Sequence, residues 1–341
     1  MPEQRFLVVR LGSLGDIVHT FPAVAGLRES YPDAEIVWLT HPRWKPLVES
    51  SGLTTDIWET ETRSYRCLRE IIGRIRKKQF TAAIDYQGLW KSAALPVVGG
   101  VSRRVGFSSQ TIREFGVPIL YTDRVGCTQT HIADQNGELS QRVGARNGVA
   151  PVVLAVPSIQ EAFVLQLLRG FAIERCVVLS PGGGWASKCW PPDRYGALCQ
   201  RIHRELGLRC ALNHGPGEEQ LVSAIKAASK KADPVAYNGS LVQLMALLRN
   251  AVCVVGGDTG PLHLAVALGT PAVAIFGPTD PARNGPYRTS GRSSASPCDI
   301  VLRSPRAATT YKRGDQAAPS ILEITIDEVF EAVRRQAEVR R

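Results

Sequence analysis

The chain has few of the features that mark exported or membrane-spanning proteins. Its 341 residues contain no apolar run close to the ~18 to 20 residues that a membrane-spanning helix needs. The longest apolar runs, such as residues 6–9, have the length of a strand. No signal-peptide cleavage site follows the first apolar stretch. We therefore expect a protein that stays in the cytoplasm.

Signs of metal, disulfide and nicotinamide chemistry are also missing. None of the eight cysteines lies two residues from another, so they are expected to be core thiols in a reducing compartment. No Asp-x-Asp pair and no His, Cys and carboxylate cluster with ligand spacing occurs, so no bound metal and no cofactor is expected. The Gly-x-Gly-x-x-Gly fingerprint of dinucleotide enzymes does not follow the first apolar run.

Positive charge is what the chain has in excess. Lys and Arg number 41 against 31 Asp and Glu, which gives a formal charge of +10 and predicts an anionic partner: nucleic acid, an acidic membrane surface or a phosphorylated substrate. Leu68, Ile72 and Ile75 recur at helical spacing within residues 63–78, which predicts a basic amphipathic helix. The alternative is a solvated helix face. The cations of this segment are Arg63, Arg66, Arg69, Arg74, Arg76, Lys77 and Lys78.

Apolar runs of strand length alternate with helical patterns along the chain. This alternation predicts an α/β fold with parallel sheets in two Rossmann-like domains. We expect domains at residues 1–165 and 170–320, a closing helix within 321–341, and loop with little regular structure over 288–320. The expected strands are 6–11, 35–40, 82–86, 176–180, 208–213, one near 235, and 272–276, and the expected helices are 17–30, 192–206, 218–228, 241–249 and 326–339.

The segment 256–263 is the most informative motif. It joins the apolar run 252–255 to a helical pattern at 264–268, so a buried strand turns through glycines into a helix. Pro261 suits the first turn of that helix, and free amides at a helix start attract anions. The motif predicts a phosphate site with Asp258, Thr259 and His263 placed to touch the ligand. An ordinary glycine-rich turn is the alternative reading.

Three other loops follow predicted strands, at the sheet edge where open parallel sheets bind ligands. Asp16, after Gly12 and Gly15, is either a helix N-cap or a base, since a carboxylate is ionised at neutral pH and can accept a proton. His19 could orient or replace it. Residues 181–188 expose glycine amides beside Lys188, which suits a diphosphate whose charge rises as it departs. After the strand at 208–213, Glu218 or Glu219 could accept hydrogen bonds from a ribose.

Five motifs in register resemble the ADP-heptose:lipopolysaccharide heptosyltransferases, glycosyltransferase family 9. The resemblance runs over nearly the whole chain, and the segment 85–92 is most like heptosyltransferase I. It implies a GT-B fold, with two Rossmann-like domains facing across a cleft, the acceptor bound by the first and the sugar nucleotide by the second. The motifs are residues 10–16 (RLGSLGD), 85–92 (DYQGLWKS), 188–191 (KCWP), 257–260 (GDTG) with His263, and 276–281 (FGPTDP).

The resemblance also assigns roles to individual residues. Asp16 corresponds to the general base, Lys188 to the diphosphate-binding lysine and Asp258 to the carboxylate that holds the donor sugar. Counting back from Asp258 favours Glu219 as the ribose ligand, whereas the Gly-Pro-Gly-Glu spacing favours Glu218. The remaining donor-binding residues are Thr259, Gly260, Pro261 and Leu262, which form the turn around the diphosphate, and His263. Two departures from the family pattern are Pro261, which removes an amide donor, and Cys189, which stands where a polar side chain is common.

The implied reaction is a metal-independent, inverting transfer of heptose from ADP-heptose to Kdo-lipid A in lipopolysaccharide inner-core synthesis, with closure of the two domains. The implied partners are the sugar nucleotide and an anionic glycolipid at the inner face of the inner membrane, with no nucleic acid. A related transferase using another sugar nucleotide and a noncatalytic binder of anionic polymers are the alternatives. The implied acceptor-binding residues are Ser13, Gly15, Arg63, Arg66, Arg69, Gln87, Lys91, Arg113 and His131.

Overall fold

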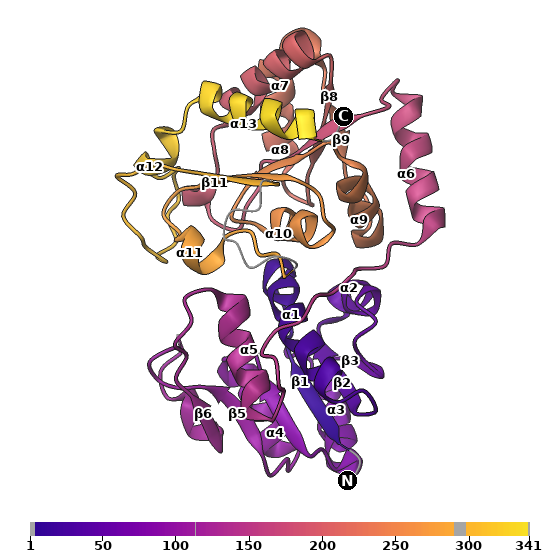
Figure 1. Cartoon of the computed structure of the whole chain (residues 1–341), viewed down its shortest axis with the longest axis vertical. Coiled ribbons are helices and arrows are strands. Elements are labelled where there is room, and N and C mark those ends of the chain that lie inside the picture. The colour runs from indigo at the N-terminus through magenta and orange to yellow at the C-terminus, as the bar shows by residue number, and fades with distance from the viewer. Residues whose placement is uncertain (1–3, 113, 290–297, 340–341) are drawn as a thin grey trace. The chain divides into compact units, whose positions relative to one another are not determined.

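The computed structural model describes residues 4–112, 114–289 and 298–339 of the chain. Its contacts divide the chain into two compact units, Met1–Ala155 and Val156–Arg341, and each is an α/β sandwich around one sheet (Figure 1). Within the described residues no helix combines the length and the apolarity of a membrane span.

The first unit is built on a parallel six-stranded sheet in the order β3-β2-β1-β4-β5-β6. Its strands are β1 (Arg5–Val9), β2 (Glu35–Thr40), β3 (Asp56–Glu59), β4 (Ala82–Asp85), β5 (Arg104–Phe107) and β6 (Asp123–Val125). Its helices are α1 (Leu14–Ser30), α2 (Lys45–Ser50), α3 (Tyr65–Lys78), α4 (Trp90–Val98) and α5 (Ile132–Arg142), with the short 3-10 turns η1 (Pro42–Trp44) and η2 (Val117–Leu120).

The basic segment forms the predicted amphipathic helix, α3. Ile71 and Ile75 are buried against Leu7 and Val9 of β1, in a cluster that also contains Leu95 of α4. Burial of the isoleucines fixes the helix on the sheet. The exposed cations of the helix are Arg66, Arg69, Arg74, Arg76 and Lys77. The segment is therefore both a structural helix and a charged surface.

The second unit repeats this design with a parallel sheet in the order β12-β11-β10-β7-β8-β9. Its strands are β7 (Cys176–Ser180), β8 (Arg209–Asn213), β9 (Val235–Tyr237), β10 (Val254–Gly257), β11 (Ala272–Phe276) and β12 (Asp299–Arg303). Its helices are α6 (Ser158–Gly170), α7 (Pro192–Leu206), α8 (Glu219–Ser229), α9 (Leu241–Asn250), α10 (Gly260–Ala267), α11 (Pro281–Asn284), α12 (Pro319–Leu322) and α13 (Ile326–Val339), with turns η3 (Ala186–Lys188) and η4 (Lys230–Ala232).

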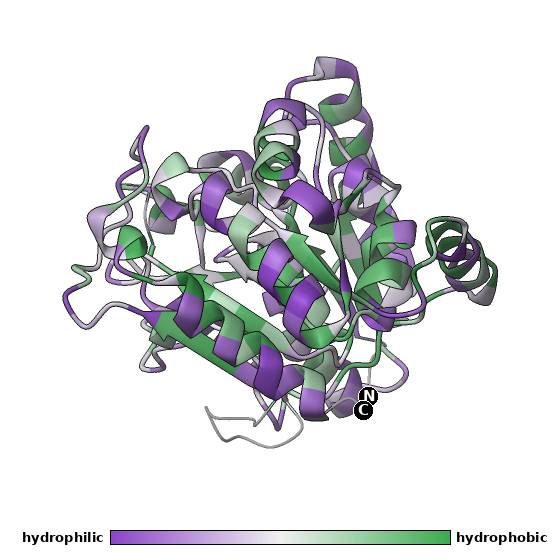
Figure 2. Cartoon of the chain, turned by 90° about the horizontal axis from the view of Figure 1, so that it is seen from above, coloured by the Kyte–Doolittle hydropathy of each residue, from purple (hydrophilic) through white to green (hydrophobic). Residues whose placement is uncertain are grey.

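The helices of the second unit cover the sheet because each buries an apolar stripe. Ile202 of α7, Ile225 of α8 and Val333 of α13 share one buried cluster with Val177 and Val255 of the central strands. Figure 2 shows the result in colour: the strands are mainly green and the helices around them alternate green and purple. Strands covered on both faces are expected to be continuously apolar, as residues 176–179 of the buried strand β7 are.

One expectation about regular structure was wrong. The stretch 288–320, expected to be loop, contains β12 at Asp299–Arg303 and α12 at Pro319–Leu322. Strand β12 pairs with β11 from Ala272↔Asp299 to Phe276↔Arg303 and forms the edge of the sheet. Its side chains are only partly buried, so it lacks the strong apolar pattern of a central strand.

The order of the strands reverses at one point in each sheet. The strand that starts each unit lies at the centre, and the chain order reverses between β1 and β4 in the first sheet and between β7 and β10 in the second. At such a switch point the two loops leaving neighbouring strands diverge and open a crevice at the carboxyl ends of the strands. The loops after β1, β4, β7 and β10 are therefore where ligand-binding side chains should gather.

Candidate active site

In the second unit the switch point brings three charged or polar side chains into contact. Asp258, directly after β10, has its Oδ2 2.6 Å from Nζ of Lys188 and its Oδ1 3.0 Å from Nε2 of His263. The side chains are 9%, 14% and 4% exposed, respectively, so the contacts are sheltered from water. Two residues predicted from the 256–263 motif and one predicted from the 181–188 loop thus form one cluster.

The surroundings of Asp258 fix its charge. Burial on its own would raise the pKa of the carboxyl, but the hydrogen bond and charge of His263 and the charge of Lys188 outweigh it and hold the pKa well below its usual range. Asp258 is therefore an ionised acceptor, and it neutralises much of the positive charge of Lys188. A ligand that binds Lys188 or Asp258 and breaks their ion pair therefore changes the charge balance of the other residue.

Glycines allow the loops to come this close. A Cβ on Gly257 would lie 2.9 Å from the carbonyl oxygen of Lys188, and one on Gly256 would lie 3.1 Å from the carbonyl oxygen of Ser180. After the strand, Thr259 is the N-cap of α10 and Pro261 lies in its first turn, as predicted from the strand–turn–helix motif. Gly260, Pro261 and Leu262 form that first turn, whose amides, except at the proline, lack intrahelical partners.

The two ribose candidates have different surroundings. Glu218 is half-buried, and its Oε2 accepts a hydrogen bond of 2.7 Å from the amide of Gly215. Its carboxylate also lies so close to Gly182 that a Cβ there would collide with it. Glu219 is exposed, and its Oε1 accepts from the amide of Gly217 at 3.1 Å. Glu218 therefore lies against the glycine-rich loop (residues 181–188) that carries Lys188, whereas Glu219 lies at the start of α8.

In the first unit the switch point centres on Asp16. Its Oδ1 is 2.7 Å from Nη2 of Arg10, and its Oδ2 accepts from the amide and hydroxyl of Ser13 at 3.0 and 2.9 Å. The N-cap of α1 is Ser13 and not Asp16, which is the third helical residue and completes a capping box. The Asp16 side chain is nevertheless 45% exposed, while that of Arg10 is 7% exposed. A carboxylate that is oriented by a buried arginine and is itself open to solvent is suited to act as a base.

The loop after β4 joins the same cluster. Oε1 of Gln87 accepts from the amide of Leu11 at 2.9 Å, and Arg10 donates to the carbonyl oxygen of Tyr86. Arg10 had no predicted role beyond the motif that contains it. Its burial is not visible in the sequence, where an arginine after an apolar strand resembles any surface cation.

Asp85 is a further residue that sequence reasoning left without a role. It is 1% exposed, and it accepts hydrogen bonds from the amides of Gln87 and Gly88 and from the hydroxyls of Ser92 and Tyr121. Burial raises the pKa of this carboxyl, against the effect of the four donors. The signal in the sequence was a carboxylate at the last position of the apolar strand β4. Asp85 shapes the loop that carries Gln87.

The other predicted acceptor residues lie on segments that follow the strands of this sheet. Arg63 precedes α3, Arg66 and Arg69 lie exposed in its first turns after β3, and Lys91 is exposed at the start of α4. Gly15 is buried in the first turn of α1. His131 is the N-cap of α5, and its ring lies 5.3 Å from that of His19, which is 6% exposed. Arg113 lies outside the described residues.

No group of three or more His, Cys, Asp or Glu side chains that could hold a metal ion occurs in the part of the chain that the structure describes. The described cysteines are all free thiols.

Two Rossmann-like units, each with polar side chains at its switch point, form the fold of GT-B glycosyltransferases. A match to glycosyltransferase family 9 (heptosyltransferase) spans residues 68–299. The chain belongs to this family, as its motifs predicted.

The chain is similar to proteins of lipopolysaccharide synthesis over most of its length. It is 23% identical to the lipopolysaccharide core heptosyltransferase OpsX of Haemophilus influenzae, over 82% of this chain and 81% of that protein. It is 27% identical to the lipopolysaccharide heptosyltransferase 1 of Pseudomonas aeruginosa, over 88% and 86%. The fold matches that of the E. coli heptosyltransferase WaaC solved with ADP, with a TM-score of 0.76, 24% identity and coverage of 98% and 100%.

Proposed function

We propose that the protein transfers heptose from ADP-heptose to Kdo-lipid A, the first heptose addition of the lipopolysaccharide inner core. The observation that carries this proposal is the pair of switch-point clusters: an exposed carboxylate oriented by Arg10 in the first unit, and a buried Asp258–Lys188–His263 cluster in the second. The names of the relatives support the donor and the pathway.

In the proposed reaction Asp16 accepts the proton of an acceptor hydroxyl while that oxygen attacks the anomeric carbon of the donor. The bond between this carbon and the diphosphate oxygen breaks, ADP leaves, and the configuration inverts. Lys188 and the free amides at the start of α10 meet the charge that develops on the diphosphate, which is the task that a metal performs in other transferases. Asp258 accepts hydrogen bonds from the donor sugar.

A nucleotide panel followed by a product assay tests this proposal. Thermal shifts should show stabilisation by ADP over UDP and GDP, because a ligand that binds only the folded state raises its melting temperature. Mass spectrometry should then show one added heptose on Kdo-lipid A, with unchanged yield in EDTA. Transfer from another sugar nucleotide would point to a related transferase, and no nucleotide binding at all would point to a noncatalytic binder of anionic polymers.

Replacing Lys188 with alanine should weaken ADP binding by roughly 10- to 100-fold, since a charge-assisted hydrogen bond contributes about 1.5 to 3 kcal/mol. Isothermal calorimetry measures the loss. Lys226→Ala removes an equal charge from an exposed site on α8 of the same unit and should leave affinity unchanged. Equal affinities of the Lys188 variant and the wild type would remove Lys188 from the diphosphate site.

The outer face of α3 is proposed to draw the protein to the anionic surface that presents its acceptor. An open hollow on this face is lined by four cations, Arg66, Arg69, Arg74 and Lys77, together with Tyr65, Glu70 and Gly73. Each cation near an anionic surface contributes about 1 kcal/mol, so replacing these four with glutamine should abolish sedimentation with phosphatidylglycerol vesicles at low salt. Binding to neutral phosphatidylcholine vesicles is the control, and unchanged sedimentation of the variant would contradict this role.

A further inference from the structure

The segment between β12 and α12, residues 304–318, is held against the proposed donor site. We call it the strap. Gly314 accepts at its carbonyl oxygen from the amide of Ser187 at 3.3 Å, and the amide of Ala318 donates back to the carbonyl oxygen of Ser187 at 3.3 Å. The amide of Thr310 donates to the carbonyl oxygen of Pro278, after β11, at 2.8 Å. The strap is thus bonded to the glycine-rich loop and to the loop after β11.

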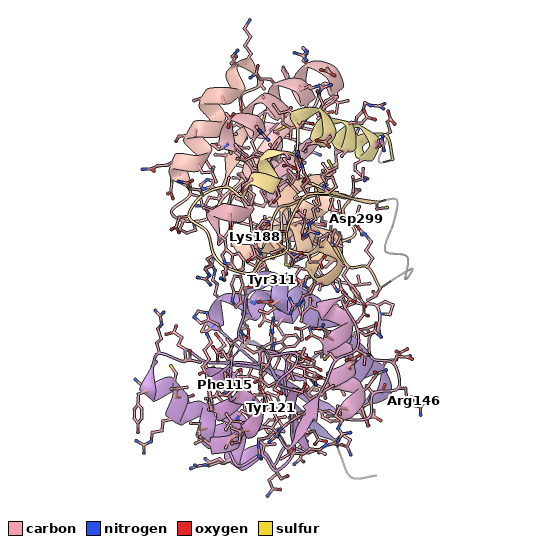
Figure 3. The ribbon with its side chains drawn as sticks, turned by 90° about the vertical axis from the view of Figure 1, so that its left-hand side faces the viewer. Phe115, Tyr121, Arg146, Lys188, Asp299 and Tyr311 are labelled. Atoms are coloured by element: carbon pink, nitrogen blue, oxygen red, sulfur yellow. The ribbon has the colours of Figure 1, made fainter. Side chains whose placement is uncertain are left out.

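Gly314 allows this close approach. A Cβ on it would lie 3.2 Å from Cβ of Ser187, which is tighter than ordinary packing. Ser187 precedes Lys188 in the chain, so the residues flanking Gly314 are placed next to the loop that carries the proposed diphosphate ligand. Figure 3 labels Lys188 on the glycine-rich loop and Tyr311 on the strap.

The indole ring of Trp185 lies near two cations, one from the glycine-rich loop and one from the strap. Nζ of Lys188 lies 4.3 Å from the centroid of the indole, and the guanidinium carbon of Arg313 lies 5.9 Å from it. Both are within the range of a cation–π interaction, which orients a cation without neutralising it. The indole therefore positions two positive charges around one ring. These charges come from segments that are more than a hundred residues apart in the sequence.

Only one of these two charges has an anionic partner in the described structure. Lys188 is paired with Asp258, whereas Arg313 is exposed and makes no ion pair with any described side chain. Lys312, beside it, is also exposed. Because Asp258 already balances the charge of Lys188, Arg313 is the cation of this pair whose charge is left for an incoming anion. The helix start nearby also lacks one amide donor, because Pro261 has no N–H.

We infer that Arg313 binds the diphosphate of the sugar nucleotide alongside Lys188, with Trp185 holding both side chains in position. The inference rests on the proposed function, since it adds a residue to the same donor site. A planar guanidinium can donate two parallel hydrogen bonds to phosphate oxygens, so Arg313 would supply donors that the first turn of α10 lacks at Pro261.

The test compares Arg313→Ala with Lys312→Ala in the full-length protein. The two variants remove equal charges from neighbouring exposed residues, and only Arg313 contacts the indole. Calorimetry should show ADP affinity reduced about 5- to 20-fold for Arg313→Ala and less than about twofold for Lys312→Ala. Arg313→Lys keeps the charge but not the paired guanidinium donors, so it should recover only part of the loss, and AMP, which lacks the second phosphate, should show a smaller difference.

The outcomes separate the two proposals. Equal losses for Arg313→Ala and Lys312→Ala, or no loss for either while the wild type binds ADP, would overturn the role of Arg313 and leave the proposed function standing. A wild-type protein that binds no nucleotide would overturn both. Arg313 is exposed, so its variants should melt at the wild-type temperature, which thermal unfolding checks.

Discussion

Asp16→Asn is expected to lower heptose transfer by about 10²- to 10⁴-fold, the usual contribution of a general base. Asparagine has the shape of aspartate but cannot accept the proton of the attacking hydroxyl. It can still accept a hydrogen bond from the amide of Ser13, so the start of α1 should remain capped. ADP affinity should stay within about twofold, since the donor residues lie in the other unit. Steady-state turnover and calorimetry measure the two effects.

Two comparisons make the result specific. Asp33→Asn changes an exposed aspartate in the turn before β2 and should retain full activity. Asp16→Ala removes the capping interaction as well and leaves the buried Arg10 without its carboxylate partner, so it should also lower the free energy of unfolding, by about 1 to 3 kcal/mol. An Asp16→Asn enzyme with most of its activity would assign Asp16 to the capping box alone.

Most of the central strands of the two sheets could be predicted because their burial leaves a strong pattern, whereas β3, β5, β6 and β12 were not predicted. Residues 35–40 and 176–180 match β2 and β7, and 192–206 and 326–339 match α7 and α13. Central strands of a parallel sheet are covered on both faces, so they are continuously apolar. Edge strand β12 is only partly covered, and its sequence DIVLR lies in a stretch rich in Ser, Pro and Arg. Its pairing with β11 is a tertiary effect that composition does not reveal.

The loops of the candidate site were predictable, but their contacts were not. Each loop follows a buried strand, and a parallel sheet brings the carboxyl ends of its strands to one edge. Lys188 and Asp258 are 70 positions apart, and the hydrogen bond between Asp85 and Tyr121 spans 36. Such pairs depend on strand order, which the sequence does not state. The ion pair of Asp258, the burial of Arg10 and the position of the strap all required the structure.

Asp258→Asn is expected to separate nucleotide binding from sugar transfer. The change removes the negative charge that is paired with Lys188, so the lysine is free to bind phosphate and ADP affinity should be unchanged or higher. An amide accepts hydrogen bonds from the sugar less strongly than a carboxylate, and kcat/KM with ADP-heptose should fall roughly 10- to 100-fold, as for the loss of a charged hydrogen bond. Calorimetry with ADP and kinetics with ADP-heptose give the two values, and ADP affinity falling in parallel with transfer would contradict the assignment.

The same variant is also expected to change how the free energy of unfolding depends on pH in acid. The reason is that His263 and Lys188 hold the pKa of Asp258 low despite its burial. A carboxyl whose pKa is lower in the folded than in the unfolded state stabilises the fold above its unfolded pKa of about 3.9, and this stabilisation is lost as pH falls toward the folded value. At pH 7 the wild type should exceed Asp258→Asn by roughly 3 kcal/mol in free energy of unfolding, since the variant leaves Lys188 largely buried without its partner. Urea titrations should show this difference at neutral pH and should show it shrinking below about pH 4. A difference that persists undiminished into strong acid would mean that packing around residue 258, and not its charge, stabilises the donor site.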